Sequence, residues 1–230
     1  MKTSMNLHST VSKQNISVSR FLHIVLFLLV ALPLSSRATD KYTEAMQKNI
    51  QAVYTQQTVA ELQNTVNTLE RIGTAEKSKW EPFYYASFGY VMMANREKDG
   101  AKKDGYLDQA TTALDKAKAL QQGDSEITAL EGFIHMIRVT VDPATRGQQY
   151  SGLATQSFHK AVALNPENPR ALALLAQMQY GTAQFFGSST EEACGTLNKS
   201  LEKFETFKAT SELAPQWGKG MAMGLKEKCK

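Results

Sequence analysis

Apolar residues recur at every third or fourth position along most of the chain after residue 40. One such run contains Leu62, Val66 and Leu69, and another extends from Leu107 to Ala117. This spacing places apolar side chains on one face of a helix. The alternation of apolar and polar residues that is typical of strands is scarce. The pattern therefore predicts an all-α protein of about eight helices joined by short polar links.

Helix start signals agree with this interpretation. In a capping box, a hydroxyl at the N-cap and a carboxylate three residues later satisfy free backbone amides. A capping residue followed by proline at the first helical position is a second such signal. The sequence contains three candidate boxes and two cap–proline pairs: Thr58/Glu61, Ser78/Glu81, Ser189/Glu192, Asp142-Pro143 and Asn168-Pro169.

The helices also repeat in sequence. A small residue, a large apolar residue and a second small residue recur at spacings of four and three. The motif occurs at Ala110/Leu114/Ala117, at Ala154/Phe158/Ala161 and, more weakly, at Ala193/Leu197/Ser200. Gly132 and Ala176 follow the first two motifs, and Gly89 is the earlier equivalent. Small residues at these places let two helices cross closely.

This pattern resembles the tetratricopeptide repeat (TPR), whose helical hairpins stack into a solenoid. The resemblance covers roughly residues 81–207 and implies about three to four repeats with a C-terminal capping helix. Family repeats have about 34 residues, whereas the small positions here are more widely spaced, and the extra residues are assigned to loops inside each repeat. An irregular helical bundle is the alternative, and residues 40–75 are either a divergent repeat or a cap.

The repeat register predicts a groove lined by the first helix of each hairpin, where large side chains with polar tips suit a peptide or protein guest. The predicted groove residues are Phe83, Tyr90, Phe133, Met136, Gln177 and Tyr180. Burial of most of these side chains in an ordinary core is the alternative.

A second candidate surface is the edge formed by the enlarged loops at 97–105, 141–150 and 184–189. Its residues are Arg146, Tyr150, Phe185 and Phe186. The two phenylalanines are either an anchor for a partner or a plug that folds into the next repeat, and the short loop favours the plug.

The N-terminal residues predict an export signal. A cationic stretch ends at Arg20, an apolar run extends from Phe21 to Leu34, and small residues at Ser36 and Ala38 predict cleavage before Thr39. The run is shorter than the roughly 20 residues that cross a bilayer, and an uncleaved anchor is the alternative. We therefore expect a signal peptide at 1–38 and one helical domain at 39–230, periplasmic or, as second choice, secreted.

Charge adds little to this interpretation. The chain has 230 residues and a net charge of +4. Four of its 26 basic residues lie in the first 38 positions, which hold no acid, and the other 22 are balanced by 22 acidic residues. A neutral domain argues against a nucleic-acid-binding face.

Export changes what the two cysteines imply. Outside the cytosol, a pair of cysteines is more often a disulfide. If helices at about 190–208 and 214–229 fold back antiparallel, Cys194 and Cys229 lie at similar heights along the hairpin. We predict a structural disulfide, with two free thiols or a redox-active pair as the alternatives.

Candidate catalytic groups are few. After processing, two histidines remain, His135 and His159, and no close ligand pair or nucleophile motif accompanies them. We expect neither enzyme activity nor a cofactor or metal. The preferred hypothesis is an exported TPR-like module that holds a protein or peptide segment. Alternatives are a small-ligand or enzyme site near Glu131, His135, Arg138 and His159, and self-association.

Overall fold

The structure, a computed structural model, describes residues 32–229, with side chains from residue 41 onward. The chain divides into two units, residues 1–42 and 43–230. The described part of the first unit is the beginning of one long helix. The predicted leader lies mostly outside the described residues, so its cleavage stays a prediction.

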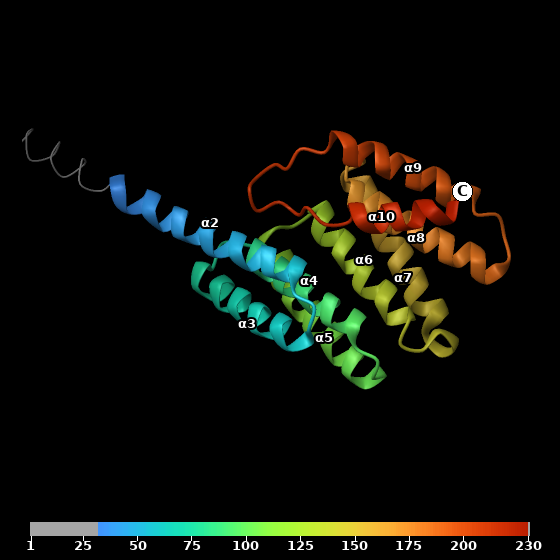
Figure 1. The fold of residues 1–230 in the computed structure, drawn as a ribbon, viewed down its shortest axis with the longest axis horizontal. Helices are drawn as coiled ribbons and strands as arrows, with labels where there is room; N and C mark the ends of the chain where they lie inside the picture. The colour runs from blue at the N-terminus through green and yellow to red at the C-terminus, as the bar shows by residue number, and fades with distance from the viewer. Residues whose placement is uncertain (1–31, 230) are drawn as a thin grey trace, which may run out of the picture. The chain divides into compact units, whose positions relative to one another are not determined.

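The described residues form nine α-helices and a short 3₁₀ helix (Figure 1). They contain no strand, and the all-α fold is confirmed. The helices are α2 (Leu32–Thr55), α3 (Val59–Glu76), α4 (Glu81–Arg96), α5 (Gly100–Leu120), α6 (Ser125–Val139), α7 (Pro143–Leu164), α8 (Pro169–Phe186), α9 (Glu191–Thr206), α10 (Lys219–Lys226) and η1 (Glu227–Cys229).

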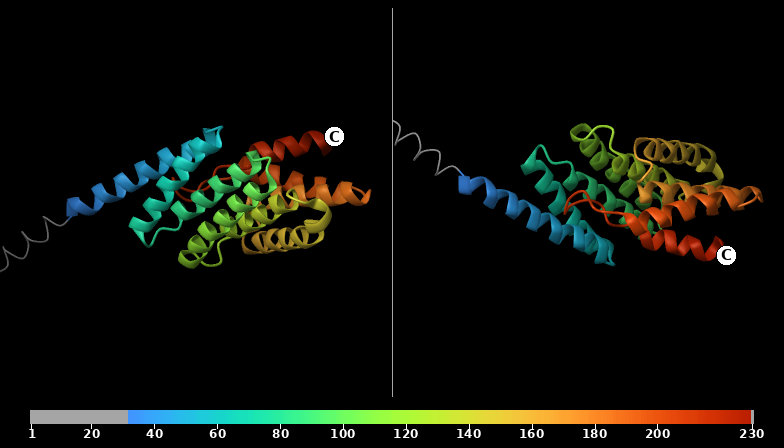
Figure 2. Two further views of the ribbon diagram at one scale, coloured as in Figure 1. Left: turned by 90° about the horizontal axis from the view of Figure 1, so that it is seen from below. Right: turned by 90° about the horizontal axis from the view of Figure 1, so that it is seen from above.

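The second unit is a stack of helical hairpins. α4 pairs with α5, α6 with α7 and α8 with α9, while the first helices α4, α6 and α8 also contact one another in that order. Figure 2 shows the three hairpins following each other along the stack. α10 packs against α8 and α9 and covers the last hairpin. The fold is therefore an all-α helical-repeat solenoid with a C-terminal capping helix.

The predicted repeat positions hold the hairpins together. The three small–large–small motifs on α5, α7 and α9 are buried throughout. At Gly132 of α6, an added Cβ would stand 2.4 Å from the ring of Phe158 on α7, so this crossing requires glycine. At Gly89 of α4, a Cβ would meet Val66 of α3 at 2.5 Å and Val53 of α2 at 3.8 Å. Residues 43–76 thus pack on α4 as a preceding helical pair.

Three of the five start signals are confirmed. Thr58 and Glu61 form a complete capping box, and Asp142 and Asn168 cap α7 and α8 before a proline. The other two candidate boxes are wrong. α4 and α9 begin at N-caps Trp80 and Thr190, one or two residues from the predicted serines, and neither N-cap side chain makes a capping bond.

The prediction of enlarged loops inside the repeats is wrong. Asp99 accepts a hydrogen bond from the Lys102 amide and starts α5, and Asp142 accepts one from the Thr145 amide and starts α7. Most residues assigned to the first two loops therefore lengthen the second helices of the hairpins, which contain 21 and 22 residues. The third loop is short because α8 continues to Phe186 and ends at Gly187, which adopts a left-handed conformation.

The C-terminal helix is also shorter than predicted. α9 ends at Thr206 and α10 begins only at Lys219. The positive φ of 102° at Gly218 is incompatible with the continuous helix that the sequence predicts from residue 214. We call the intervening residues 207–218 the strap.

Candidate functional site

The strap lies on the inner face of the stack, the surface formed by the first helices of the hairpins. Trp217 stacks on Phe88 of α4 and on Phe133 of α6, with ring centroids 4.8 Å and 5.9 Å apart. Its indole Nε1 donates a 3.0 Å hydrogen bond to the hydroxyl oxygen of Tyr84. Trp217 is buried by these contacts. The face on which the sequence predicts a guest segment is therefore covered here by the chain itself.

The strap contacts this face in an alternating manner. Leu213, Pro215 and Trp217 are buried, whereas Gln216 between them is exposed. Residues 215–217 show the alternation of an extended segment, in which successive side chains point to opposite sides. Residues 211–214 form a turn in which the Ala214 amide donates to the Ser211 carbonyl. Two tyrosines hold the backbone of the strap. The Tyr85 hydroxyl donates to the Leu213 carbonyl at 2.8 Å, and the Gln216 amide donates to the Tyr54 hydroxyl at 3.3 Å.

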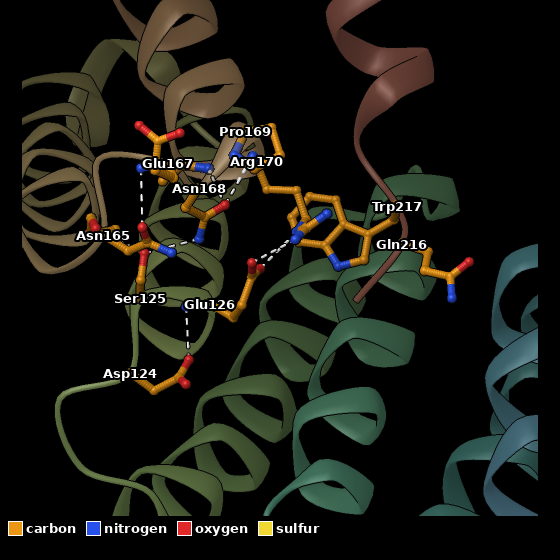
Figure 3. Close-up of polar contacts among 12 residues, drawn as sticks. Asp124, Ser125, Glu126, Asn165, Glu167, Asn168, Pro169, Arg170, Gln216 and Trp217 are labelled. Carbon is orange, nitrogen blue, oxygen red and sulfur yellow. Dashed lines mark hydrogen bonds and ion pairs between the residues drawn. The ribbon is translucent and has the colours of Figure 1, made fainter. Parts of the chain in front are cut away.

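A buried ion pair lies beside the strap (Figure 3). Arg170 of α8 donates two hydrogen bonds, of 2.7 Å and 2.8 Å, to the carboxylate of Glu126 on α6. The Arg170 guanidinium also lies 4.4 Å from the ring centroid of Phe207, at the start of the strap. A Cβ at Gly218 would stand 2.9 Å from the Arg170 side chain. Arg170 therefore links two hairpins to both ends of the strap.

Burial dominates the electrostatics of this region. It raises the pKa of the Glu126 carboxyl above its usual range, and the hydrogen bonds from Arg170 oppose that shift. Burial also raises the pKa values of the Tyr84 and Tyr85 hydroxyls, so both remain neutral hydrogen-bonding groups. Removal of one partner from a buried ion pair typically costs about 3–5 kcal/mol, because the other charge is left without compensation. The arrangement is suited to holding the strap in place.

A polar network connects the helix termini near which Glu126 and Arg170 lie. The Asn168 side chain accepts bonds from the Arg170 and Ala171 amides and donates to the Ser125 hydroxyl at 2.9 Å. Ser125 in turn donates to the Ala161 carbonyl at 2.8 Å. The N-termini of α6 and α8 and the C-terminal end of α7 are thereby connected.

Two predicted groove residues do not line an open groove. Phe83 packs against Gly73 of α3, where an added Cβ would meet its ring at 2.7 Å, and Lys116 of α5 lies over the ring. Tyr90 is buried, and its hydroxyl donates to Glu70 of α3 at 3.5 Å. The prediction is wrong for both side chains, because their contacts are with the second helices.

The other four groove candidates differ in their surroundings. Phe133 lies beneath Trp217, Met136 is half-buried, and Gln177 is exposed. The half-buried Tyr180 donates to the Lys228 carbonyl at 3.4 Å, and so contacts the C-terminal turn. They are therefore not brought together as one open groove, and a binding role for them stays a prediction.

Two predicted loop-edge residues lie in a helix instead. Arg146 belongs to α7 and forms an ion pair with Asp104 of α5 at 2.7 Å. Tyr150, also on α7, stacks on His135 of α6 with centroids 6.0 Å apart, and Arg138 lies over its ring. Both residues join neighbouring helices, which corrects their assignment to a loop.

Phe185 and Phe186 form an exposed aromatic pair. Phe185 is 80% exposed and Phe186 is 74% exposed, more than any other large hydrophobic side chain of the described residues. Their rings pack edge to face with centroids 5.0 Å apart. The expected plug is wrong, because α8 extends to Phe186 and both rings are exposed at the end of the last hairpin. The alternative, that the two phenylalanines anchor a partner, stays a prediction.

The predicted disulfide is confirmed. Cys194 near the start of α9 is bonded to Cys229 in η1, with the Cα atoms 5.7 Å apart. The bond attaches the C-terminal turn to the hairpin end that carries the two exposed phenylalanines. A structural disulfide is typical of proteins outside the cytosol.

Ion pairs engage the charged side chains on either side of His135. Glu131 pairs with Lys118 at 2.6 Å, and Arg138 pairs with Asp108 at 2.6 Å. His135 is half-buried with Nδ1 unpartnered, burial lowers its pKa, and His159 is exposed. In the described part of the chain, no three His, Cys, Asp or Glu side chains are placed to hold a metal ion.

A small cavity of about 180 Å³ lies in the same repeat. Lysines 118 and 160 line it together with the α5–α6 link and the start of α6. None of the predicted site residues belongs to it.

Trp217, Arg170 and Glu126 were not predicted from the sequence as site residues. The alternation at Leu213, Pro215 and Trp217 was the available signal for the strap. A cationic residue directly after the Asn168-Pro169 cap carries no comparable signal, because its acidic partner is 44 positions away.

Among the helices that the structure describes, none is both long and apolar enough to cross a membrane. No known protein-family model and no curated protein matches the chain. Solved structures that are similar to it include the following two. One is the HusA haemophore from Porphyromonas gingivalis, which is 28% identical, with a TM-score of 0.74 over 82% of this chain and 92% of that chain. The other is a thermophilic TPR protein from Thermus thermophilus, which is 19% identical, with a TM-score of 0.55 over 79% of this chain and 88% of that chain. The TPR-like helical fold of the chain is consistent with both.

Proposed function

We propose that the chain is an exported binding protein for haem or a closely related porphyrin, and that the exposed Phe185–Phe186 pair contacts the porphyrin ring. The observation that carries the proposal is the likeness to a haemophore over nearly the whole length of that protein, at 28% identity. The Cys194–Cys229 disulfide supports a location outside the cytosol.

The aromatic pair has suitable chemistry for such a ligand. A porphyrin is a flat, largely apolar ring, and phenyl rings bind such surfaces through stacked or edge-to-face contacts. Two adjacent rings exposed by 80% and 74% are costly to leave in water, and a ligand that covers them gains that hydrophobic free energy. Ligand contact therefore accounts for an exposure that the fold itself does not require.

Nearby charges match the acidic groups of haem. The C-terminal turn η1 is attached by the disulfide to the same end of the α8–α9 hairpin, and two lysines are exposed there, Lys226 at the end of α10 and Lys228 in η1, with the exposed Glu227 between them. Lysine ammonium groups attract carboxylates such as the two propionates of haem. Residues 169–229 contain no histidine. The proposal therefore assigns binding to the ring and the propionates rather than to an axial histidine from this end of the stack.

The direct test is a titration of the purified oxidised chain with haemin, followed by absorbance in the Soret region. The same titration with metal-free protoporphyrin separates ring contacts from iron coordination. We expect both ligands to bind, and we expect the double variant Phe185→Ala/Phe186→Ala to weaken both about 10- to 100-fold, which corresponds to roughly 1.4–2.8 kcal/mol.

The matched control is Leu120→Ala/Leu164→Ala, which removes two other exposed apolar side chains at the ends of α5 and α7. This control should bind both porphyrins as the unaltered chain does. Equal affinity of the phenylalanine variant and the control would contradict the assignment of the surface. Absence of haemin binding by the unaltered chain would contradict the proposed function.

A protein or peptide partner is the second candidate function, and one observation favours it. The inner face already holds a polypeptide segment, the strap, through side-chain and backbone contacts. Capture of a defined partner by crosslinking of the tagged protein in its own cells would support this function. The absence of catalytic activity stays part of both proposals.

A further inference from the structure

The last two turns of α8 combine an exposed aromatic ring with helix backbone that no side chain covers. Gly181 lies four positions before Phe185, and residues at this spacing are neighbours on one face of a helix. Both residues are exposed. The Phe185 ring is therefore bordered on its own helix by a position without a side chain. We call the surface formed by Gly181 and the Phe185 ring the seat.

The packing of the fold does not require glycine at position 181. A Cβ added there would have no atom within 4 Å, whereas one added at Gly132 would overlap a ring. Glycine inside a helix is also less favourable than alanine. Gly152 of α7 has equally open surroundings, but its neighbours one turn away are Gln148 and Gln156. Gly181 differs because an exposed aromatic ring lies beside it.

The two phenylalanines do not offer equivalent surfaces to a flat ligand. Their rings are nearly perpendicular, with an interplanar angle of 89°. A planar ligand that stacks on one ring therefore meets the other ring edge-on. Beside Phe185 the helix is open at Gly181, whereas the exposed side chain of Thr182 lies one turn before Phe186. Stacking on Phe185 is thus the arrangement in which a wide ring meets no further side chain at the preceding turn.

We propose that Gly181 is a specificity-determining residue of the porphyrin site. The ring stacks on Phe185 and lies flat over the backbone of α8 at position 181, and Phe186 contacts it edge-on. This inference rests on the proposed function and narrows its ligand class to porphyrins with at least one flat, unobstructed face. An axial ligand on each face of the metal would hold the ring away from the helix, so such a porphyrin fits the seat poorly.

The test compares Gly181→Leu with the matched control Gly152→Leu, in titrations of the full-length oxidised chain with metal-free protoporphyrin. A leucine side chain at position 181 occupies the seat, and we expect about tenfold weaker binding. Leucine is favoured over glycine within a helix, so the same variant should unfold about 2–3 °C higher than the unaltered chain. Weaker binding by a more stable protein separates a ligand contact from a structural role. Gly152→Leu should gain similar stability and keep its affinity.

Two further comparisons report on the geometry of the seat. The loss caused by Gly181→Leu should largely disappear in the Phe185→Ala background, because the ring no longer stacks there, and should persist in the Phe186→Ala background. Cobalt(III) protoporphyrin with an imidazole on each face should bind the unaltered chain about tenfold more weakly than metal-free protoporphyrin. Gly181→Ala, with an expected loss of about threefold, replaces the leucine variant if circular dichroism shows that the latter is unfolded.

The outcomes distinguish this inference from the proposed function. Unchanged or tighter protoporphyrin binding by a folded variant at position 181 would overturn the inference, as would equal affinity for the six-coordinate cobalt porphyrin. If Phe185→Ala/Phe186→Ala still weakens binding in that case, the proposed function stands and only the role of Gly181 is lost. Absence of porphyrin binding by the unaltered chain would overturn both.

Discussion

The indole nitrogen of Trp217 donates a hydrogen bond to the hydroxyl oxygen of Tyr84, 133 positions earlier in the chain. This contact joins the strap to the first of the three hairpins, whereas Arg170 and Phe207 join it to the last. The C-terminal segment therefore connects hairpins that are not neighbours in the stack. Repeat stacks otherwise depend on contacts between adjacent units.

The first prediction concerns the stability that this connection provides. Trp217→Ala should lower the free energy of unfolding by about 3–5 kcal/mol, because it removes a large buried side chain and leaves a cavity between α4 and α6. Urea denaturation followed by circular dichroism measures the change. Gln216→Ala is the matched control, since that neighbouring side chain is exposed, and it should shift the value by less than about 0.5 kcal/mol. Similar stabilities for both variants would contradict the structural role of the strap.

The second prediction concerns the disulfide. Cys194→Ser/Cys229→Ser should lower the free energy of unfolding by roughly 3–4 kcal/mol, because the bond closes a long loop in the unfolded chain. Denaturation of the oxidised protein and of the variant gives the difference. Reducing agent should destabilise the unaltered protein similarly and should leave the variant unchanged. A variant as stable as the oxidised chain would show that the bond does not constrain the fold.

The third prediction compares two glycines within helices. Gly132→Ala should destabilise the protein by about 1–3 kcal/mol, because the new methyl group would overlap the Phe158 ring. Gly152 of α7 has no atom within 4 Å of the place of a Cβ, so Gly152→Ala should stabilise by about 0.5–1 kcal/mol. Thermal unfolding of both variants tests the sign. An unchanged stability of Gly132→Ala would contradict the close crossing of α6 and α7, and destabilisation by Gly152→Ala would contradict the open surroundings of that position.

The fourth prediction concerns pH. Burial lowers the pKa of His135 below the ordinary value of 6.5, so the unfolded chain binds the proton first as the pH falls. Protonation of His135 in the unfolded chain therefore lowers the free energy of unfolding as the pH falls from about 7.5 through 6.5 to the folded-state pKa. His135→Gln should weaken this dependence, measured by denaturation between about pH 5 and pH 7.5. An unchanged pH dependence in His135→Gln would contradict the assignment.

The fold was predictable because its signals are local and periodic. Ala154, Phe158 and Ala161 are spaced as one face of a helix, and all three are buried against the partner helix. Helix starts were predicted correctly where a side chain at the cap bonds to the next turn, as at Asp142. They were wrong at Ser78 and Ser189, where a hydroxyl and a carboxylate have the right spacing but the helix begins elsewhere.

The site was less predictable because its contacts connect distant parts of the chain. Tyr90 and Phe83 are of residue types that often line binding grooves. Only the tertiary packing of the helices places both side chains against α3. The Arg170–Glu126 pair and the Trp217–Tyr84 bond depend on how the hairpins and the strap are stacked. Phe185 and Phe186 were singled out from the sequence, but their exposure depends on the length of α8, which a terminal glycine alone does not determine.

The most direct test of the proposed function is hydrogen–deuterium exchange of the full-length oxidised protein, with and without saturating protoporphyrin. The account predicts slower exchange of backbone amides around residues 180–190 and 226–229, at the end of the α8–α9 hairpin, with little change in the strap. Protection confined to other helices would contradict the assigned surface, and no protection anywhere would contradict porphyrin binding itself.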